Sequence, residues 1–226
     1  MKIFQLLVLS SLIIAVLAGC EKAKEMNEAS TDVFVKAIKN NQGVIVYAVG
    51  HQVISQNGMK SVSVKSMDAI TTQLIQPDGL NNLFLYEPIE ADYVTTLPVA
   101  GNYTYSVTFK DEEKISYSNT LSTSVLAPPN ITSLVKSANG DSVYISWDAI
   151  SGAHAYQLNV KKGTMPVYFG SPLTGQVLKI GIPTSAYTSY GNGIGNYTFA
   201  LSGLLYETTA LNYLQAISTS TKDITL

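Results

Sequence analysis

Short runs of β-branched and aromatic residues, separated by turn residues, fill the chain from about residue 31 onward, a pattern typical of β-sandwiches and barrels. The runs that predict strands in the first half are residues 43–49, 61–67, 71–76, 83–88, 93–98, 103–109 and 115–125. Those in the second half are residues 131–135, 143–147, 155–162, 165–169, 176–183, 197–202 and 211–218. Residues 66–76 are the one segment where a short helix competes with a strand. The pattern therefore predicts an all-β protein.

Two of the Asn-Gly pairs between these runs predict turns, because both residue types tolerate positive φ. Asn57-Gly58 predicts a β-hairpin, and Asn139-Gly140 predicts a turn between the first two strands of the second half. The strand pattern stops at Leu126-Ala127-Pro128-Pro129, since consecutive prolines lack the N–H donors that a central strand needs. We place a domain boundary there, with one domain at residues 31–126 and a second at 127–226.

An internal repeat supports two domains. The segment Gly-Asn-Tyr-Thr-Tyr-Ser-Val at 101–107 is echoed by Gly-Asn-Tyr-Thr-Phe-Ala-Leu at 195–201, a spacing of 94 residues between positions 101 and 195. That spacing is close to the roughly 100 residues of an immunoglobulin-like sandwich. Alternation along each strand places the large apolar side chains on one face. They are Tyr103, Tyr105, Val107 and Phe109 in the first copy, and Tyr197, Phe199 and Leu201 in the second.

The second half resembles a fibronectin type III domain, whereas the first half matches only at its sixth strand and is expected to be immunoglobulin-like on the repeat alone. The resemblance rests on Pro129, Val143-Tyr144-Ile145-Ser146-Trp147-Asp148, Gly152 with residues 156–160, and residues 195–199. A glycine-rich segment at 191–195 replaces the family's usual turn before Tyr197. The resemblance implies two tandem β-sandwiches that serve as a spacer, adhesion or recognition module and bind through their surfaces.

The N-terminus has the pattern of an export signal. Lys2 is followed by an apolar stretch at residues 3–17, which is shorter than the ~20 residues of a membrane-spanning helix. The sequence Leu17-Ala18-Gly19-Cys20 resembles the lipobox of bacterial lipoproteins. This resemblance implies a cleaved signal peptide at residues 1–19, a diacylglycerol on the thiol of Cys20 and an acyl chain on its amine. Residues 20–30 are then the lipidated cysteine and a tether.

The alternative is an ordinary signal peptide cut near Ala18, with Cys20 left as a thiol. Cys20 is the only cysteine, and a lone reactive thiol is a liability in an oxidising compartment, so lipidation is favoured. Glu21 follows Cys20, in place of the Asp that typically retains lipoproteins at the inner membrane. We therefore expect a cell-envelope protein, lipid-anchored in the outer membrane, on its periplasmic or its surface face.

Charge and composition narrow the class of partner. Only 13% of the residues are charged, and all fourteen basic residues are Lys. Nucleic-acid binding relies on a basic face and on Arg, so we expect no nucleic-acid partner. The expected partners are the membrane, through the lipid, and an unidentified protein or glycan.

The chain is poor in the residues that catalysis needs. It has two histidines, His51 and His154, and lacks a Gly-x-Ser-x-Gly nucleophile motif. It contains no metal-binding motif, and residues 111–113 (Asp-Glu-Glu) are interpreted as a hairpin tip in preference to a Ca²⁺ ligand set. We expect no enzymatic activity, no metal and no cofactor beyond the covalent lipid.

The leading hypothesis is a non-enzymatic, membrane-anchored module for binding, adhesion or structure in the bacterial cell envelope. The alternative is a carbohydrate-binding accessory lipoprotein of a glycan-uptake system. Its candidate site is the glycine-rich loop at residues 187–196, where Tyr187 and Tyr190 could offer flat rings to a sugar. The competing interpretation of this loop is that the tyrosines pack on their own domain.

Overall fold

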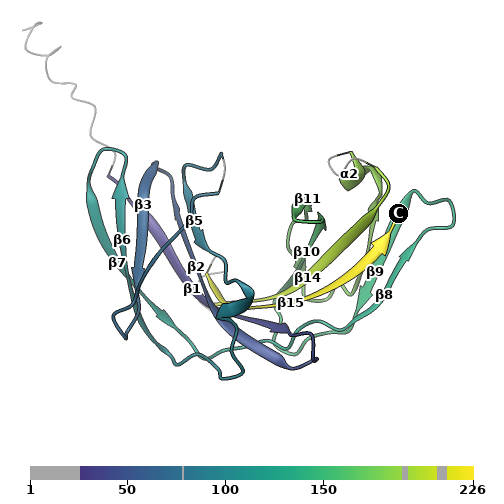
Figure 1. Ribbon diagram of the computed structural model, residues 1–226, viewed down its shortest axis with the longest axis horizontal. Helices are drawn as coiled ribbons and strands as arrows, with labels where there is room; N and C mark the ends of the chain where they lie inside the picture. Colours follow the sequence, from purple (N-terminus) through teal and green to yellow (C-terminus); the bar gives the residue numbers. More distant parts are fainter. Residues whose placement is uncertain (1–25, 78, 190–192, 208–212) are drawn as a thin grey trace, which may run out of the picture.

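A computed structural model describes residues 26–77, 79–189, 193–207 and 213–226. These residues form a U with two arms (Figure 1). The first arm contains β1 (Ala29–Lys39), β2 (Ile45–Ser55), β3 (Met59–Lys65), β4 (Thr71–Gln73), β5 (Leu83–Tyr86), β6 (Gly101–Phe109) and β7 (Lys114–Leu121). The second contains β8 (Ile131–Lys136), β9 (Ser142–Trp147), β10 (Ala155–Lys162), β11 (Met165–Phe169), β12 (Leu173–Thr174), β13 (Lys179–Pro183), β14 (Asn196–Tyr206) and β15 (Leu214–Thr225). Two short helices, η1 (Glu90–Asp92) and α2 (Ser185–Thr188), complete the described elements.

The strands form one long sheet and two smaller ones. The long sheet has the order β11-β10-β14-β15-β1-β2-β5, with β12 also paired to β10. It lines the inside of the U, while the sheet β4-β3-β6-β7 covers the outside of the first arm and β13-β9-β8 the outside of the second (Figure 1). The all-β fold class with two sandwiches is thus confirmed.

Each arm has a core between its two sheets. In the second arm, Trp147 on β9 packs in one cluster with Leu158 on β10 and Phe199 on β14. In the first arm, Val53 on β2 shares a cluster with Val107 on β6. The large side chains that the repeat places on one face are buried, except for Tyr103, which is half-buried. The alternation read from the two copies is therefore confirmed.

The two arms are joined by strand pairing. The sequence-based prediction of two separate tandem domains did not include this pairing. β15 pairs with β14 along its length and, on its other edge, runs parallel to β1 from Val35↔Ala216 to Ile38↔Thr219. The linker between the arms is also attached, because the Ser218 hydroxyl donates to the Ala127 carbonyl at 2.9 Å. In the sequence, the hydrophobic clusters of the first arm come before residues 126–127 and the cluster of the second arm comes after them. One sheet nevertheless continues from one arm into the other. The boundary between independent domains stays a prediction.

Several local predictions were wrong. β1 was missed because Asp32 and Lys36 interrupt its apolar pattern. Asn57-Gly58 does not form a hairpin, because β2 and β3 belong to different sheets. Residues 93–98 form only an isolated bridge between Val94 and Tyr47. In the segment 66–76, by contrast, the predicted strand is present as the short β4, and the competing helix is not formed. Asn139-Gly140 does form a turn, with Gly140 at φ 75°.

The described part of the chain contains no helix that is both long and apolar enough to span a membrane.

Candidate binding cleft

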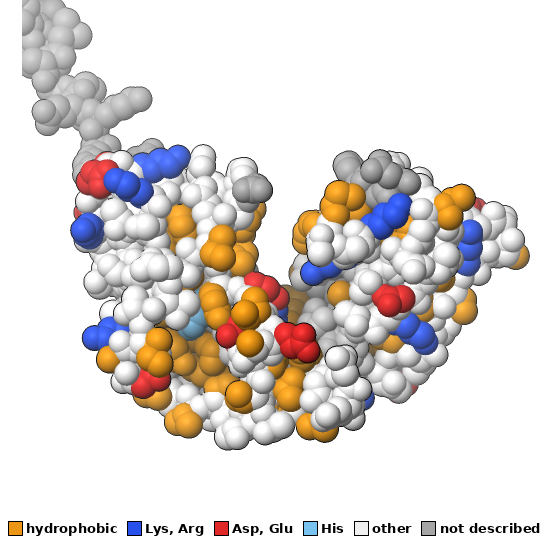
Figure 2. Space-filling model, in the orientation of Figure 1, with side chains coloured by type: hydrophobic (Ala, Val, Ile, Leu, Met, Phe, Trp, Pro, Cys, Tyr) orange, Lys and Arg blue, Asp and Glu red, His pale blue; other side chains and the backbone are white. Residues whose placement is uncertain are grey.

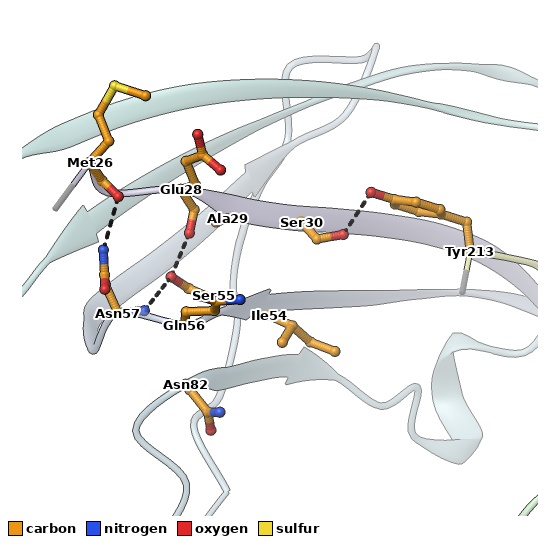
Figure 3. Close-up of a pocket in the computed structure, with 10 residues that line it drawn as sticks. All are labelled: Met26, Glu28, Ala29, Ser30, Ile54, Ser55, Gln56, Asn57, Asn82 and Tyr213. Carbon is orange, nitrogen blue, oxygen red and sulfur yellow. Dashed lines mark hydrogen bonds between the residues drawn. The ribbon is translucent and has the colours of Figure 1, made fainter. Parts of the chain in front are cut away.

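A cavity lies at the N-terminal end of β1. Its volume is ≈ 720 Å³, within the range of small-molecule sites. We call it the N-terminal cleft, and it is lined by Met26, Glu28, Ala29, Ser30, Ile54, Ser55, Gln56, Asn57, Asn82 and Tyr213 (Figure 3). A smaller cavity of ≈ 320 Å³ shares Ala29, Ser30 and Tyr213 with it. The two cavities thus meet at the start of β1.

The position of the cleft follows from the register of β1 and β2. Ser30 and Ile54 are cross-strand partners, and they lie on the face opposite Val53, which points into the core. The cleft therefore opens on the side of the long sheet that faces away from the first core. Figure 2 shows the hollow between the two arms, with hydrophobic side chains on its floor and inner walls.

Hydrogen bonds hold the walls of the cleft in place. The Ser55 hydroxyl donates to the Glu28 carbonyl at 2.5 Å and accepts from the Asn57 backbone N–H at 3.0 Å. The Asn57 amide donates to the Met26 carbonyl at 3.1 Å, and Ser30 donates to the Tyr213 hydroxyl at 3.0 Å (Figure 3). These bonds fix the segment before β1 against the end of β2.

A second set of bonds anchors the same segment to the β6–β7 hairpin. The side-chain amide of Asn27, which is buried, donates to both carboxylate oxygens of Asp111 at 3.0 Å and to Glu113 at 2.7 Å. Asp111 and Glu113 lie at the hairpin tip, as expected from the sequence. Within the described residues, no group of three or more His, Cys, Asp or Glu side chains could hold a metal ion.

Three polar side chains of the cleft take no part in these hydrogen bonds. Gln56, Asn82 and the carboxylate of Glu28 make no side-chain hydrogen bond within the described part of the protein, and all three residues are exposed. Their hydrogen-bonding groups are therefore available to a ligand.

Beside the cleft, on the same face of the sheet as Ser30, β1 carries the buried carboxyl of Asp32. Its Oδ2 accepts the Leu214 N–H at 2.8 Å, which ties β1 to the start of β15. Its Oδ1 is buried and has no partner among the described residues. Burial, with a smaller contribution from the charge of Glu207, raises the pKa of Asp32 to about 7. This carboxyl lies near the joint between the two arms, which is the pairing of β1 with β15.

His51 lies on the core side of the same strands. Its Nδ1 is 2.9 Å from the Tyr105 hydroxyl, which in turn donates to the backbone carbonyl of Asp32 at 2.9 Å. Since the single hydroxyl proton of Tyr105 is used for that carbonyl, Nδ1 of His51 must carry a hydrogen and donate to Tyr105. Burial lowers the pKa of His51 to about 4. The imidazole is neutral and enclosed, so this network has a structural role.

The side chain of His154 also makes a hydrogen bond: its Nδ1 accepts the Tyr206 backbone N–H at 3.3 Å. Its ring stacks on that of Tyr206, with the centroids 6.4 Å apart.

The structure places Tyr187 in the core of the second arm and not on a binding surface. Its side chain is 0% exposed, and its ring makes edge-to-face contacts with Tyr197 at 5.3 Å and Phe199 at 5.7 Å. The idea that Tyr187 offers a flat ring to a sugar is therefore corrected, because large apolar area gains more from burial than from exposure. Tyr190 and Cys20 lie outside the described residues.

Sequence reasoning did not find the cleft. Its lining residues come from four separate stretches between positions 26 and 213, and they form no motif. The only local signal was Asn57-Gly58, which marks a turn but says nothing of a ligand.

Comparison with known proteins shows no family for this chain. No family model and no curated protein matches the chain. It is similar to a segment of two fibronectin type III domains from chicken tenascin, at 12% identity over 89% of this chain and 98% of that chain, with a TM-score of 0.34. It is also similar to the chicken interferon gamma receptor alpha chain, at 9% identity over 89% of this chain and 98% of that chain, with a TM-score of 0.30.

A bacterial ice-binding adhesin is another neighbour, at 11% identity over 90% of this chain and 65% of that chain, with a TM-score of 0.29. These TM-scores are low, and no argument on function rests on the likenesses. The neighbours include fibronectin type III proteins, the family that the second half resembles in sequence.

Proposed function

We propose that this protein is a non-enzymatic binding module of the bacterial cell envelope, held at the outer membrane by a lipid on Cys20. The observation that carries the proposal is the long sheet. Because β1 and β15 pair across the joint, the two sandwiches present one continuous concave surface with a preformed cleft. A preformed surface loses little conformational entropy on binding.

The state of the histidines supports a role without catalysis. A general base needs a free nitrogen within reach of a substrate. His51 is 6% exposed and bonded to Tyr105, and Nδ1 of His154 is bonded to the backbone.

The position of the cleft supports a role close to a membrane. Met26 lines the cleft and is six positions after Cys20. Six extended residues span at most about 22 Å. With a lipid on Cys20, the cleft would lie within that distance of the anchored residue.

The binding function can be tested with a photo-crosslinking amino acid on intact cells. Placed at Gln56 in the cleft, it is expected to form a discrete adduct with an envelope component. The matched control is Gln42, an exposed glutamine in the turn at the opposite end of the β1–β2 hairpin, which should give no adduct. Absence of an adduct from Gln56, or equal adducts from both positions, would contradict the proposal.

A further inference from the structure

The lining of the N-terminal cleft indicates the chemistry of its ligand. None of its ten lining residues is basic, and Glu28 is the one acidic member. Without a cation among the described lining residues, these residues offer no charge partner for a phosphate, a sulfate or a carboxylate. Anionic ligands are therefore disfavoured.

The groups that are present suit a ligand rich in hydroxyls. Gln56 and Asn82 each offer an amide that both donates and accepts, and the carboxylate of Glu28 accepts. None of the three is used by the described protein itself. Such groups match hydroxyls, which also donate and accept.

The apolar part of the lining suits the other face of a sugar. Tyr213 is half-buried, and its hydroxyl is held by Ser30, so the ring has a fixed edge. Met26 and Ile54 are exposed, at 77% and 44%, and supply aliphatic surface beside it. A sugar ring has both hydroxyls and apolar C–H faces, and amphipathic aromatic side chains are suited to such surfaces.

We propose that the N-terminal cleft binds the uncharged sugar residues of a glycan displayed close to the membrane. The location near the membrane rests on the proposed function, because it requires the lipid on Cys20. The sugar chemistry rests on the lining alone. The candidate carbohydrate site is thus the N-terminal cleft and not Tyr187, which is buried. No sequence motif marks this cleft.

The test is a glycan array probed with the chain as processed by the cell, purified from membranes in detergent and labelled. The array carries fragments of neutral polysaccharides, headgroup oligosaccharides of neutral glycolipids, and anionic glycosaminoglycan fragments. Neutral spots are expected to bind and anionic spots are not. The pattern among neutral spots then separates a polysaccharide source from a glycolipid source.

A pair of double variants links binding to the cleft. Gln56→Ala with Asn82→Ala is expected to weaken binding to the best neutral glycan by about tenfold or more, because the ligand loses the hydrogen bonds of two side chains. Gln42→Ala with Asn41→Ala removes the same two exposed side-chain types at the far end of the β1–β2 hairpin, and should leave binding unchanged. All four side chains are exposed, and circular dichroism melts check that both variants fold.

Three results would overturn the inference: no neutral glycan binds, anionic glycans bind better, or the cleft variant binds as well as the control variant. A blank array together with an adduct from the photo-crosslinker at Gln56 would refute the sugar chemistry and leave the proposed function standing. Loss of both signals would refute both.

Discussion

The buried carboxyl of Asp32 and the buried imidazole of His51 are expected to oppose each other in the pH dependence of stability. Burial raises the pKa of Asp32 from 3.8 to about 7, so the folded protein holds a proton there that the unfolded chain has released. The stability from this group is fully present below about pH 4 and is lost as the pH rises to about 7. At about 1.4 kcal/mol per pKa unit, the loss is on the order of 4 kcal/mol.

His51 has the opposite sign. Burial lowers its pKa from 6.5 to about 4, so the unfolded chain takes up a proton that the folded protein rejects. Its contribution is present above about pH 6.5 and is lost as the pH falls to about 4, by an amount on the order of 3 kcal/mol. Between about pH 4 and about pH 6.5 the two slopes nearly cancel. We therefore expect the parent protein to have an almost flat stability profile there.

Asp32→Asn separates the two effects. The amide oxygen keeps an acceptor for the Leu214 N–H, and the side chain cannot ionise. At about pH 8 the variant is expected to be more stable than the parent by up to about 4 kcal/mol, and at about pH 4 the two should be equal. The stability of the variant should also rise with pH between these values, because only His51 still contributes a slope.

The assay is urea unfolding across this pH range, followed by circular dichroism and by the fluorescence of Trp147. Asp148→Asn is the matched control, because Asp148 is exposed and its substitution should leave the profile unchanged. If Asp32→Asn is no more stable than the parent at about pH 8, or if its profile stays flat, the reasoning from burial is wrong.

Five further substitutions at four positions test the packing and one ion pair. Tyr187→Ala should lower the free energy of unfolding by about 3 to 5 kcal/mol. Tyr187→Phe should leave it unchanged, because the buried hydroxyl has no partner among the described residues. Equal urea midpoints for the two variants would contradict the core position of Tyr187. Gly50→Ala should destabilise by about 1 to 3 kcal/mol in the same assay, because a Cβ there lies 2.5 Å from the Phe34 ring, and a neutral effect would show that the ring can move. Lys36 is buried and paired with exposed Glu87. Glu87→Gln should therefore destabilise the protein more than Lys36→Met, because only the first substitution leaves an uncompensated buried charge. The reverse order of melting temperatures would refute this.

The sequence allowed prediction of elements in which alternation and burial agree. β6, β9, β10 and β14 were found because Tyr105, Ile145, Leu158 and Phe199 belong to strands with apolar residues at every second position. β1 was missed because Asp32 and Lys36 lie in it, and each is tolerated only through a partner far along the chain, namely Leu214 and Glu87. Local patterns carry no information about such partners.

The joint and the cleft were beyond prediction for the same reason. The pairing of Val35 with Ala216 joins residues at opposite ends of the chain, and periodicity sets which face a strand buries but not its neighbour. The cleft depends on that joint, because its lining includes Ser30 of β1 and Tyr213 just before β15, which are hydrogen-bonded to each other. The sequence left two interpretations of Tyr187 open, because a tyrosine beside glycines suits both an exposed loop and a packed turn.

The measurement that tests the central claim most directly is mass spectrometry of the N-terminal peptide of the protein isolated from its native membrane. The account predicts a chain that starts at Cys20, with a diacylglycerol on the sulfur and an acyl chain on the amine. An unmodified thiol, or a chain that starts before Cys20, would contradict it.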